Sequence, residues 1–327
     1  MSGQRISVVV PVRNAEPTIG RTLEALFRST RKPQEVVVVD DGCTDGTMEI
    51  VARYPCRVVR SPDPGGVAAA RNAGAAATGG EILFFTDADV ELAEGALQAA
   101  STAMEDPRVS VAVGLQSARS AFPNAASVYK NLWLHHTYKV RAKSVSVLYS
   151  SAVAIRRSVF DAVGGFDVNY RRPNIEDSEL GKRITEAGHK ISIVPDIAFL
   201  HIKRYTLRGM VRTDFLRTVG MTKVQLRDRF RRIAKENYTS IPTSFLVSCA
   251  APWVWVLLAA GGGGGGGPLL LSIVFVLVLN FRWLRFLAAA EGPLFLFPSA
   301  FFLLLDVLAV NAGILYGLLD YARGHRY

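Results

Sequence analysis

The chain has few cysteines, and their pattern excludes two common ways of stabilising a fold. Its 327 residues include three cysteines, Cys43, Cys56 and Cys249. The number is odd, no Cys-x-x-Cys pair is present, and no cysteine–histidine cluster accompanies them. A disulfide framework and a structural zinc site are therefore not expected. Isolated, reduced thiols in a reducing compartment are the interpretation that remains.

The beginning of the chain lacks the features of a signal peptide. Its first apolar run, Ile6–Val12, is shorter than a signal-peptide core and is not followed by a small-residue cleavage site. The run is typical of a buried strand. We therefore expect the first domain to remain in the cytoplasm.

Charge becomes scarce after Ile241, although the whole chain carries a net charge of +10. No lysine follows this residue, and the charged side chains that remain are Arg282, Arg285, Arg323, Arg326, Glu291, Asp306 and Asp320. A membrane span needs about 20 mainly apolar residues. We predict a transmembrane region at 241–327 with two to three spans, at about 244–260, 262–280 and 294–319. The glycine run Gly261–Gly267 is expected to be a loop that leads into a short or tilted second span.

A basic stretch at 203–240 precedes this region. Lysines and arginines far outnumber acids there, and apolar residues recur at roughly helical spacing. Such a segment next to apolar spans is typical of helices that lie on a membrane surface. The alternatives are a solvated basic face or a nucleic-acid patch; we expect a membrane and no nucleic acid.

The first domain, at 1–202, alternates strand and helix patterns. Continuous apolar runs indicate strands at Ile6–Val12, Glu35–Val39, Arg57–Arg60, Glu81–Phe85, Val109–Leu115, Ser144–Ile155 and Ile191–Val194. Helical spacing indicates helices at Thr18–Phe27, Asp45–Arg53, Gly66–Ala77, Leu92–Met104, Val159–Val163 and Asp177–Ala187. This alternation predicts an α/β fold with a mostly parallel sheet between helices.

Polar residues follow three of these strands, at Pro11–Asn14, Asp40–Asp45 and Asp87–Asp89. Ligands of open α/β sheets bind beyond the carboxyl ends of the strands, so a site is expected at this edge. No Gly-x-Gly-x-x-Gly follows the first strand, which disfavours an NAD-dependent oxidoreductase. A turn and helix cap remains an alternative for Asp40 and Asp41.

The third strand end concentrates negative charge. Asp87 and Asp89 stand one residue apart after a buried strand, an arrangement that is costly without a cation. Carboxylate oxygens are typical ligands of Mg²⁺ and Mn²⁺, which also bridge to phosphates. Arg71, alone in an alanine-rich helix, needs an anionic or carbonyl partner, such as a nucleotide phosphate, a base edge or the pair Asp40 and Asp41.

Two further acids, Glu176 and Asp177, are predicted at the start of a helix. Acids are favoured there by the helix dipole, so capping is one interpretation. The functional alternative is a general base.

In this order and spacing, the motifs resemble those of family 2 glycosyltransferases over residues 4–235. The resemblance is carried by Val10-Pro11-Val12-Arg13-Asn14, Val39-Asp40-Asp41-Gly42, Ala70-Arg71-Asn72-Ala73-Gly74, Thr86-Asp87-Ala88-Asp89, Gly164-Gly165-Phe166-Asp167 and Glu176-Asp177. It implies a GT-A fold, a nucleotide-sugar donor, a divalent metal (Mg²⁺ or Mn²⁺) and inversion at the anomeric carbon.

The resemblance also implies roles for single residues. The donor-binding residues would be Pro11, Arg13, Asn14, Asp40, Asp41, Arg71 and Asp87. The metal would be held by Asp89, Asp87 and His201, and the catalytic residues would be Asp177, as the base, and Glu176 beside it. From the residues alone, His201 is only a single histidine after a strand.

One motif of the family's processive polymer synthases, Gln-x-x-Arg-Trp, is missing. The segment Gln225–Phe230 has another spacing and no tryptophan. The resemblance therefore implies a non-processive enzyme that transfers one sugar per encounter. We expect a lipid-linked or envelope-glycan acceptor at the inner cell membrane, with several spans and a cytoplasmic catalytic domain. A nucleotidyltransferase and a non-catalytic membrane partner of a glycan assembly complex are the alternatives.

Overall fold

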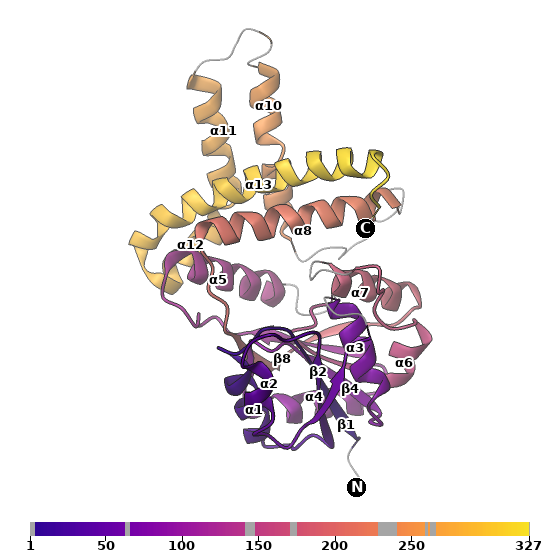
Figure 1. Cartoon of the computed structure of the whole chain (residues 1–327). Coiled ribbons are helices and arrows are strands. Elements are labelled where there is room, and N and C mark those ends of the chain that lie inside the picture. The colour runs from indigo at the N-terminus through magenta and orange to yellow at the C-terminus, as the bar shows by residue number, and fades with distance from the viewer. Residues whose placement is uncertain are drawn as a thin grey trace. The chain divides into compact units, whose positions relative to one another are not determined.

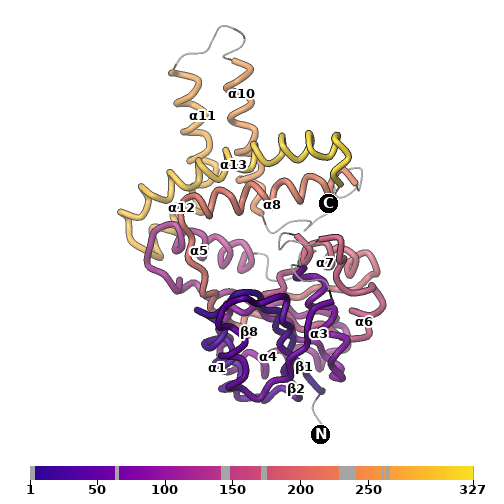
Figure 2. The backbone as a smooth tube through the Cα atoms, viewed as in Figure 1, coloured from indigo at the N-terminus to yellow at the C-terminus, as the bar shows by residue number. Residues whose placement is uncertain are grey.

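A computed structural model describes residues 4–62, 66–140, 148–170, 175–227, 241–258, 261 and 266–326. The chain divides into two compact units (Figures 1 and 2). The described residues of the first unit are those within 4–121 and 134–203. Those of the second unit lie within 122–133 and 204–326.

The first unit is built on an eight-stranded sheet in the order β3-β2-β1-β4-β7-β6-β8-β5. Its strands are β1 (Ile6–Val12), β2 (Glu35–Asp40), β3 (Arg57–Arg60), β4 (Ile82–Thr86), β5 (Val90–Leu92), β6 (Val111–Gln116), β7 (Ala152–Arg156) and β8 (Ile191–His201). The first four strands in that order are parallel, whereas β7 runs antiparallel to both of its neighbours and β5 runs antiparallel to β8. The carboxyl ends of β1, β2 and β4 consequently share one edge of the sheet.

Helices cover both faces of this sheet. The helices of this unit are α1 (Ile19–Arg28), α2 (Thr47–Val51), α3 (Val67–Ala76), α4 (Ala96–Glu105), α6 (Arg157–Ala162) and α7 (Glu176–Glu186). Apolar residues of α1, α2 and α4 share one core with the sheet, and those of α3, α6 and α7 share the other. Strands β1 and β4 are buried along their whole length for this reason, which explains their continuous apolar sequence.

Helix α3 lies unusually close to the sheet because of Gly74. A Cβ atom on this residue would lie 2.3 Å from Cγ1 of Val9 and 2.9 Å from Cγ2 of Val39. Only glycine fits such a close approach between helix and strand. The contact fixes the height of α3 above the sheet, and with it the position of Arg71 one turn earlier.

The predicted α/β class is confirmed, but several elements differ from the prediction. The parallel pairings outnumber the antiparallel ones, four to three, but the sheet is mixed, because β7 enters between β4 and β6 in the opposite direction. The helix expected from Leu92 begins at Ala96, because Val90–Leu92 pairs with the end of β8 as a strand. Of the strand expected at Ser144–Ile155, residues 144–147 lie outside the described residues, and the strand itself begins at Ala152.

Helix α5 (Ala125–Val140) is absent from the sequence prediction. Its residues up to Trp133 group with the second unit and those from Leu134 with the first. The other helices of the second unit are α8 (Leu207–Arg227), α9 (Thr243–Ser248), α10 (Ala251–Leu258), α11 (Gly266–Leu279), α12 (Phe281–Glu291), the short 3₁₀ helix η2 (Pro293–Phe295) and α13 (Leu296–Ala322).

Within the second unit, α8 and α13 run side by side, as do α10 and α11 (Figures 1 and 2). Aromatic side chains form the centre of its core, where Tyr129 and Trp133 of α5 pack against Trp283 of α12. The basic stretch predicted at 203–240 corresponds to α8 as far as Arg227; residues 228–240 lie outside the described residues.

One continuous helix of the described residues, Pro293–Ala322, is long and apolar enough to cross a membrane. The segment predicted at 244–260 corresponds to Thr243–Leu258, which is apolar but shorter. The segment predicted at 262–280 corresponds to α11, which together with α12 passes the same test only as a pair bent by 65°. Of the predicted glycine loop, residues 262–265 lie outside the described residues.

Candidate active site

Asp87 follows β4 directly and is held by two side chains. Its Oδ1 accepts a hydrogen bond of 2.8 Å from Nη2 of Arg71, and its Oδ2 accepts one of 2.8 Å from Oγ of Ser151. Ser151 precedes β7, whose antiparallel pairing with β4 brings Ala152 opposite Thr86. The mixed part of the sheet therefore orients the first acid of the Asp-x-Asp motif.

The second acid of the motif, Asp89, meets His201 through a strand pairing. Strand β5 begins one residue after Asp89, and Val90 lies opposite His201 at the end of β8. Nε2 of His201 lies 3.1 Å from Oδ1 of Asp89. Burial acts to raise the pKa of Asp89, but the charge and hydrogen bond of the His201 imidazole outweigh it, so this pKa lies below its usual value.

Asp87, Asp89 and His201 together form a group that suits a divalent cation. One ligand atom of each lies within 4.8 Å of the others. Carboxylate oxygens with one imidazole match the preferences of Mn²⁺, and oxygen ligands suit Mg²⁺. The hydrogen bonds to Arg71, Ser151 and His201 leave lone pairs on both carboxylates, because each ionised carboxylate offers about four acceptor sites. The residues present therefore fit the expected metal.

Arg71 links this group to helix α7. Its Nη1 donates a hydrogen bond of 2.8 Å to Oε1 of Glu176, and its Nη2 donates to Asp87. The guanidinium is buried and lies 5.2 Å from the ring centroid of Phe166. Burial acts to lower the pKa of Arg71, but the two carboxylates raise it above its usual value, so the side chain keeps its charge. Its carboxylate partners are thus Asp87 and Glu176, not Asp40 or Asp41.

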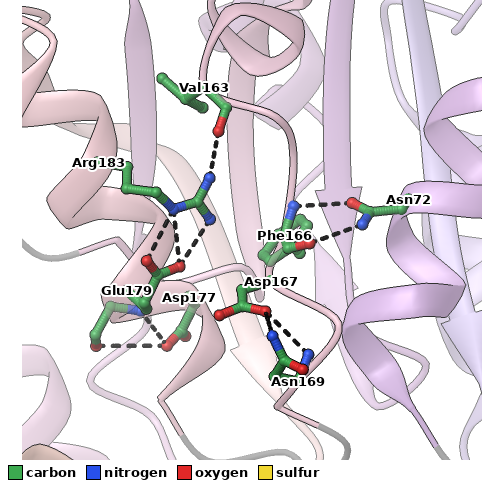
Figure 3. A network of polar contacts seen from close by, with 9 residues as sticks. Asn72, Val163, Phe166, Asp167, Asn169, Asp177, Glu179 and Arg183 are labelled. Carbon is green, nitrogen blue, oxygen red and sulfur yellow. Dashed lines mark hydrogen bonds and ion pairs between the residues drawn. The ribbon is translucent and has the colours of Figure 1, made fainter. Parts of the chain in front are cut away.

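The loop that carries Phe166 is fixed to α3 by a single asparagine. Asn72 accepts a hydrogen bond from the backbone N–H of Phe166 and donates one to its carbonyl, both at 2.8 Å (Figure 3). Gly165 has φ +66°, and a Cβ there would lie 2.7 Å from Oδ1 of Asn72. The motif Gly164-Gly165-Phe166-Asp167 therefore has a structural role, because it places the Phe166 ring against Arg71.

Helix α7 begins with the two predicted catalytic acids, which have different surroundings. Glu176 is buried and paired with Arg71. Asp177 is less buried, and its Oδ1 accepts a 2.7 Å hydrogen bond from the backbone N–H of Ser178 (Figure 3). Two residues after Asp177, Glu179 pairs with Arg183, which also donates to the carbonyl of Val163. The structure thus separates the two acids into a buried anchor and a more accessible carboxylate.

A second polar cluster lies at the carboxyl ends of β1 and β2. Oδ1 of Asp40 accepts hydrogen bonds from the backbone N–H groups of Gly42, at 3.1 Å, and Cys43, at 2.8 Å. Burial acts to raise the pKa of Asp40, but these N–H groups lower it below its usual value. Asn14, with φ +50°, accepts from the backbone N–H of Thr44 at 2.8 Å. The two loops therefore hold each other in place.

The remaining predicted donor-binding residues differ in exposure. Pro11 is buried in β1 opposite Val39, and Asp41 is also buried. Arg13 is exposed beyond the strand end. All three belong to the sheet edge that Asp40 and Asn14 share.

Two residues that contribute to the site were not identified from the sequence. Ser151 gave no signal, because the pairing of β7 with β4 is not encoded in any local pattern. Phe166 lay inside a quoted motif, but its contact with Arg71 depends on the fold. The sequence around His201 gave no reason to place it in the site. The pairing of β5 with β8 supplies that reason, because it brings His201 next to Asp89.

Residues 7–164 match the family model described as glycosyl transferase family 2. This part of the chain belongs to that family. The resemblance stated from the sequence motifs is thereby confirmed, and the match covers all the site residues up to Asp89.

Curated relatives point in the same direction. The chain is 31% identical over 219 residues to the pre-mycofactocin glycosyltransferase of Mycobacterium tuberculosis, covering 64% of this chain and 45% of that protein. It is 26% identical over 239 residues to glycosyltransferase AglE of Haloferax volcanii, covering 68% and 75%. The chain thus spans less than half the length of the first of these relatives.

Among solved structures, the chain resembles the mannosyltransferase PcManGT from Pyrobaculum calidifontis, which was determined in complex with GDP-Man and Mn²⁺. The TM-score is 0.67 at 21% sequence identity, and the match covers 98% of this chain and 88% of that one. At this identity the likeness concerns the fold, which is of the GT-A type expected from the motifs.

Proposed function

We propose that this chain is an inverting glycosyltransferase that moves one sugar from a nucleotide-sugar donor to a hydroxyl group of an acceptor. The observation that carries the proposal is the meeting of Asp87, Asp89 and His201 with Arg71 and the start of helix α7. In such a transfer a bound cation can stabilise the leaving diphosphate and a carboxylate can act as the base, and here the ion pairs of Arg71 join the cation-binding group to the start of α7. The family membership of residues 7–164 supports the same reaction.

Asp89, Asp87 and His201 would hold the Mg²⁺ or Mn²⁺ ion. When bound, such an ion supplies positive charge to the donor's diphosphate, the leaving group of the reaction. The manganese in the structure of PcManGT supports this choice of metal. The hydrogen bonds from Arg71 and Ser151 keep the Asp87 carboxylate oriented toward the group.

The sheet edge at the ends of β1 and β2 would bind the nucleoside part of the donor. Asp40 and Asp41 offer carboxylates for a base or ribose, and the exposed Arg13 offers a cation. Asn14 holds the Thr44 loop, and Pro11 sets the end of β1. Because β1, β2 and β4 are parallel, this cluster lies at the same edge as Asp87.

Asp177 would act as the general base. It would accept the proton of the acceptor hydroxyl as the oxygen attacks the sugar from the face opposite the leaving group. Glu176 was expected to be catalytic together with Asp177. We propose that it is a positioning residue instead, because its buried carboxylate is paired with Arg71. This role would fix the start of α7 relative to the metal ligands.

We place the enzyme at the inner cell membrane with its catalytic domain in the cytoplasm. The apolar helices of the second unit and the basic residues of α8 support this location. A lipid-linked or envelope-glycan acceptor would fit an enzyme in this position. The absence of the Gln-x-x-Arg-Trp motif supports transfer of a single sugar.

A donor screen tests the proposal. The full chain in detergent would be heated with Mn²⁺ and GDP-mannose, or with other GDP-, UDP- and dTDP-sugars, and its melting temperature recorded. One donor should stabilise the chain in a metal-dependent way, and Asp89→Asn should remove that stabilisation. With an acceptor present, the released product should be a nucleoside diphosphate. Release of a sugar 1-phosphate, with the nucleotidyl group passed on, would identify a nucleotidyltransferase instead. The absence of both donor binding and transfer with every donor, with or without metal, would support a non-catalytic partner.

A further inference from the structure

The long apolar helix α13 turns polar and small residues inward, together with Phe302, Leu303 and Val307, and its outward side is apolar. Its buried residues include Ser299, Asp306, Asn311, Gly313 and Gly317. Its outward side carries Phe297, Phe301, Leu308, Leu315 and Leu319, of which Phe297 is 78%, Leu308 55% and Leu319 58% exposed. These outward residues recur at spacings of four and seven and so form one stripe. A helix whose outward side faces water carries polar residues there, so this apolar stripe needs an apolar environment.

The inward side of α13 is packed along α8 over several turns. A Cβ on Gly313 would lie 2.8 Å from the carbonyl oxygen of Phe215, and one on Gly317 would lie 2.9 Å from Cβ of Thr222. Beyond them, Asp320 pairs with Lys223 at 2.5 Å. Small residues on α13 thus let the two backbones approach closely, and the two helices behave as one element.

Helix α8 is too charged to cross a membrane. Arginines or lysines occur along its whole length, at Arg208, Arg212, Arg217, Lys223 and Arg227. Arg208 and Arg212 are exposed. Charged side chains in a bilayer core need a protein or water partner, so a crossing by α13 would carry much of α8 into hydrocarbon with it.

The helices α10 and α11 of the same unit run across the direction of α13 (Figures 1 and 2). No charged residue occurs between Ile241 and Phe281, and many outward side chains of both helices are apolar. This charge-free pair is therefore the element that suits insertion into the hydrocarbon core. If α10 and α11 point into the bilayer, α13 lies along its plane.

The charged residues of the second unit are also divided between its interior and its surface. Asp214, Asp306 and Asp320 are paired inside the unit, with Lys130 or Lys223. The exposed cations of its described residues include Arg208, Arg212, Arg282, Arg285, Arg323 and Arg326, whereas Glu291 is its exposed acid. Outward arginines beside an outward apolar stripe suit the anionic headgroups and acyl chains of a bilayer surface.

We propose that α13 does not cross the membrane, but lies in the plane of its surface together with α8, with the stripe Phe297–Leu319 in contact with lipid acyl chains. The proposal rests on the membrane association proposed above and is independent of the transfer reaction. It replaces the third span expected from the sequence. The two ends of α13, and with them Arg323 and Arg326, then lie on the same side of the membrane as α8.

Depth measurements with spin labels test this arrangement. In the full chain with Cys43→Ser, Cys56→Ser and Cys249→Ala, single cysteines would be introduced as Phe297→Cys, Leu308→Cys or Leu319→Cys and labelled. The labelled protein would be reconstituted into phosphatidylcholine vesicles containing one third phosphatidylglycerol. Collision rates with oxygen and with a water-soluble nickel complex give the depth of each label. Ala309→Cys is the matched control, because its side chain is next to Leu308 in sequence but buried.

The three exposed positions should report the same shallow depth to within about 5 Å, and the label at 309 should be shielded from both reagents. A crossing helix would instead separate positions 297 and 319 by about 30 Å, because 22 residues rise about 33 Å. That gradient would overturn the in-plane arrangement and leave the membrane association standing. If all three labels were found in water, both the in-plane arrangement and the membrane association would be overturned. Neither outcome affects the assignment of the transfer site.

A measurement on the unlabelled chain covers the case in which a labelled variant misfolds. Compartment-sensitive reporters would be fused in turn to the N-terminus and the C-terminus in cells. We expect both to report the cytoplasm. A C-terminal reporter active only in an oxidising compartment would overturn the proposal, since it requires α13 to cross.

Discussion

Each unit of this protein contains a buried cation held between two carboxylates. In the first unit, Arg71 lies between Asp87 and Glu176, with both contacts at 2.8 Å. In the second, Lys130 of α5 lies 2.6 Å from Asp214 and 3.9 Å from Asp306. Each cation joins helices or strands that are distant in sequence.

The two clusters differ in how exposed their carboxylates are and in what else these carboxylates contact. The Asp87 side chain is 25% exposed and belongs to the group with Asp89 and His201. The Asp306 side chain is 3% exposed, and its other oxygen accepts a hydrogen bond of 3.0 Å from the hydroxyl of Tyr129. The first cluster is therefore open to a ligand, whereas the second is closed by protein. Buried charge alone does not identify an active site; access to the charged atoms does.

The largest effect is expected for Asp89→Asn in the open cluster. This change removes a metal ligand while keeping the size of the side chain, and charge stabilisation by a bound metal is worth several kcal/mol. We expect transfer to fall by about 10⁴-fold with an unchanged melting temperature without donor. Glu91→Gln, on β5 and paired with Arg21 away from the group, is the control and should stay near wild-type activity. Normal turnover by Asp89→Asn at saturating Mn²⁺ would remove the metal assignment.

Asp177→Asn should cause the second largest loss of transfer. Loss of a positioned proton acceptor typically costs about 10²–10⁴-fold in rate, while donor affinity should be kept because the metal ligands are untouched. Steady-state transfer and equilibrium donor binding, measured on the same sample, separate the two quantities. Glu179→Gln, in the same helix turn, is the control. An equal collapse of donor binding in Asp177→Asn would mean that the carboxylate only caps the helix.

Arg71→Met and Lys130→Met test whether the clusters are independent. Each leaves buried carboxylates without their cation, which typically destabilises by about 3–5 kcal/mol. All four tryptophans, Trp133, Trp253, Trp255 and Trp283, belong to the second unit. Urea unfolding followed by tryptophan fluorescence should therefore shift for Lys130→Met and not for Arg71→Met.

Donor binding should show the reverse pattern, because Arg71 contacts the metal ligand Asp87 and Lys130 contacts none of the metal ligands. Arg71→Lys is the second variant: it keeps the charge but lacks the fork that reaches both acids. We expect it to fold better than Arg71→Met and still bind donor poorly. A tryptophan signal that shifts equally for all three variants would show that the two units unfold together.

The smallest effect is expected for Asp306→Asn. The amide can still accept the hydrogen bond of Tyr129, and Lys130 keeps Asp214 as its partner. Stability should change by no more than about 1 kcal/mol, with transfer unaffected. Glu176→Gln, the corresponding change in the first cluster, should lower transfer because it loosens Arg71. If Asp306→Asn abolished transfer, the closed cluster would have a functional role and the comparison would fail.

Much of the first unit could be predicted from the sequence because its signals are local. The buried strands β1, β2 and β4 appear as continuous apolar runs, and the polar residues at their ends indicate a ligand-binding edge. The order of the motifs identified the family. The apolar composition after Ile241 and the basic stretch before it indicated a membrane-associated region.

The parts that the sequence left undecided depend on pairings between distant residues. The antiparallel entry of β7 brings Ser151 to Asp87, and the pairing of β5 with β8 brings His201 to Asp89; a buried strand has the same apolar pattern whichever direction it runs. The two acids at the start of α7 are neighbours in sequence, and only the packing of α3 onto the sheet at Gly74 places Arg71 where it pairs with Glu176. For α13, hydropathy determined that the helix is apolar, but which side faces α8, and so how it meets a membrane, was decided by tertiary contacts that composition does not record.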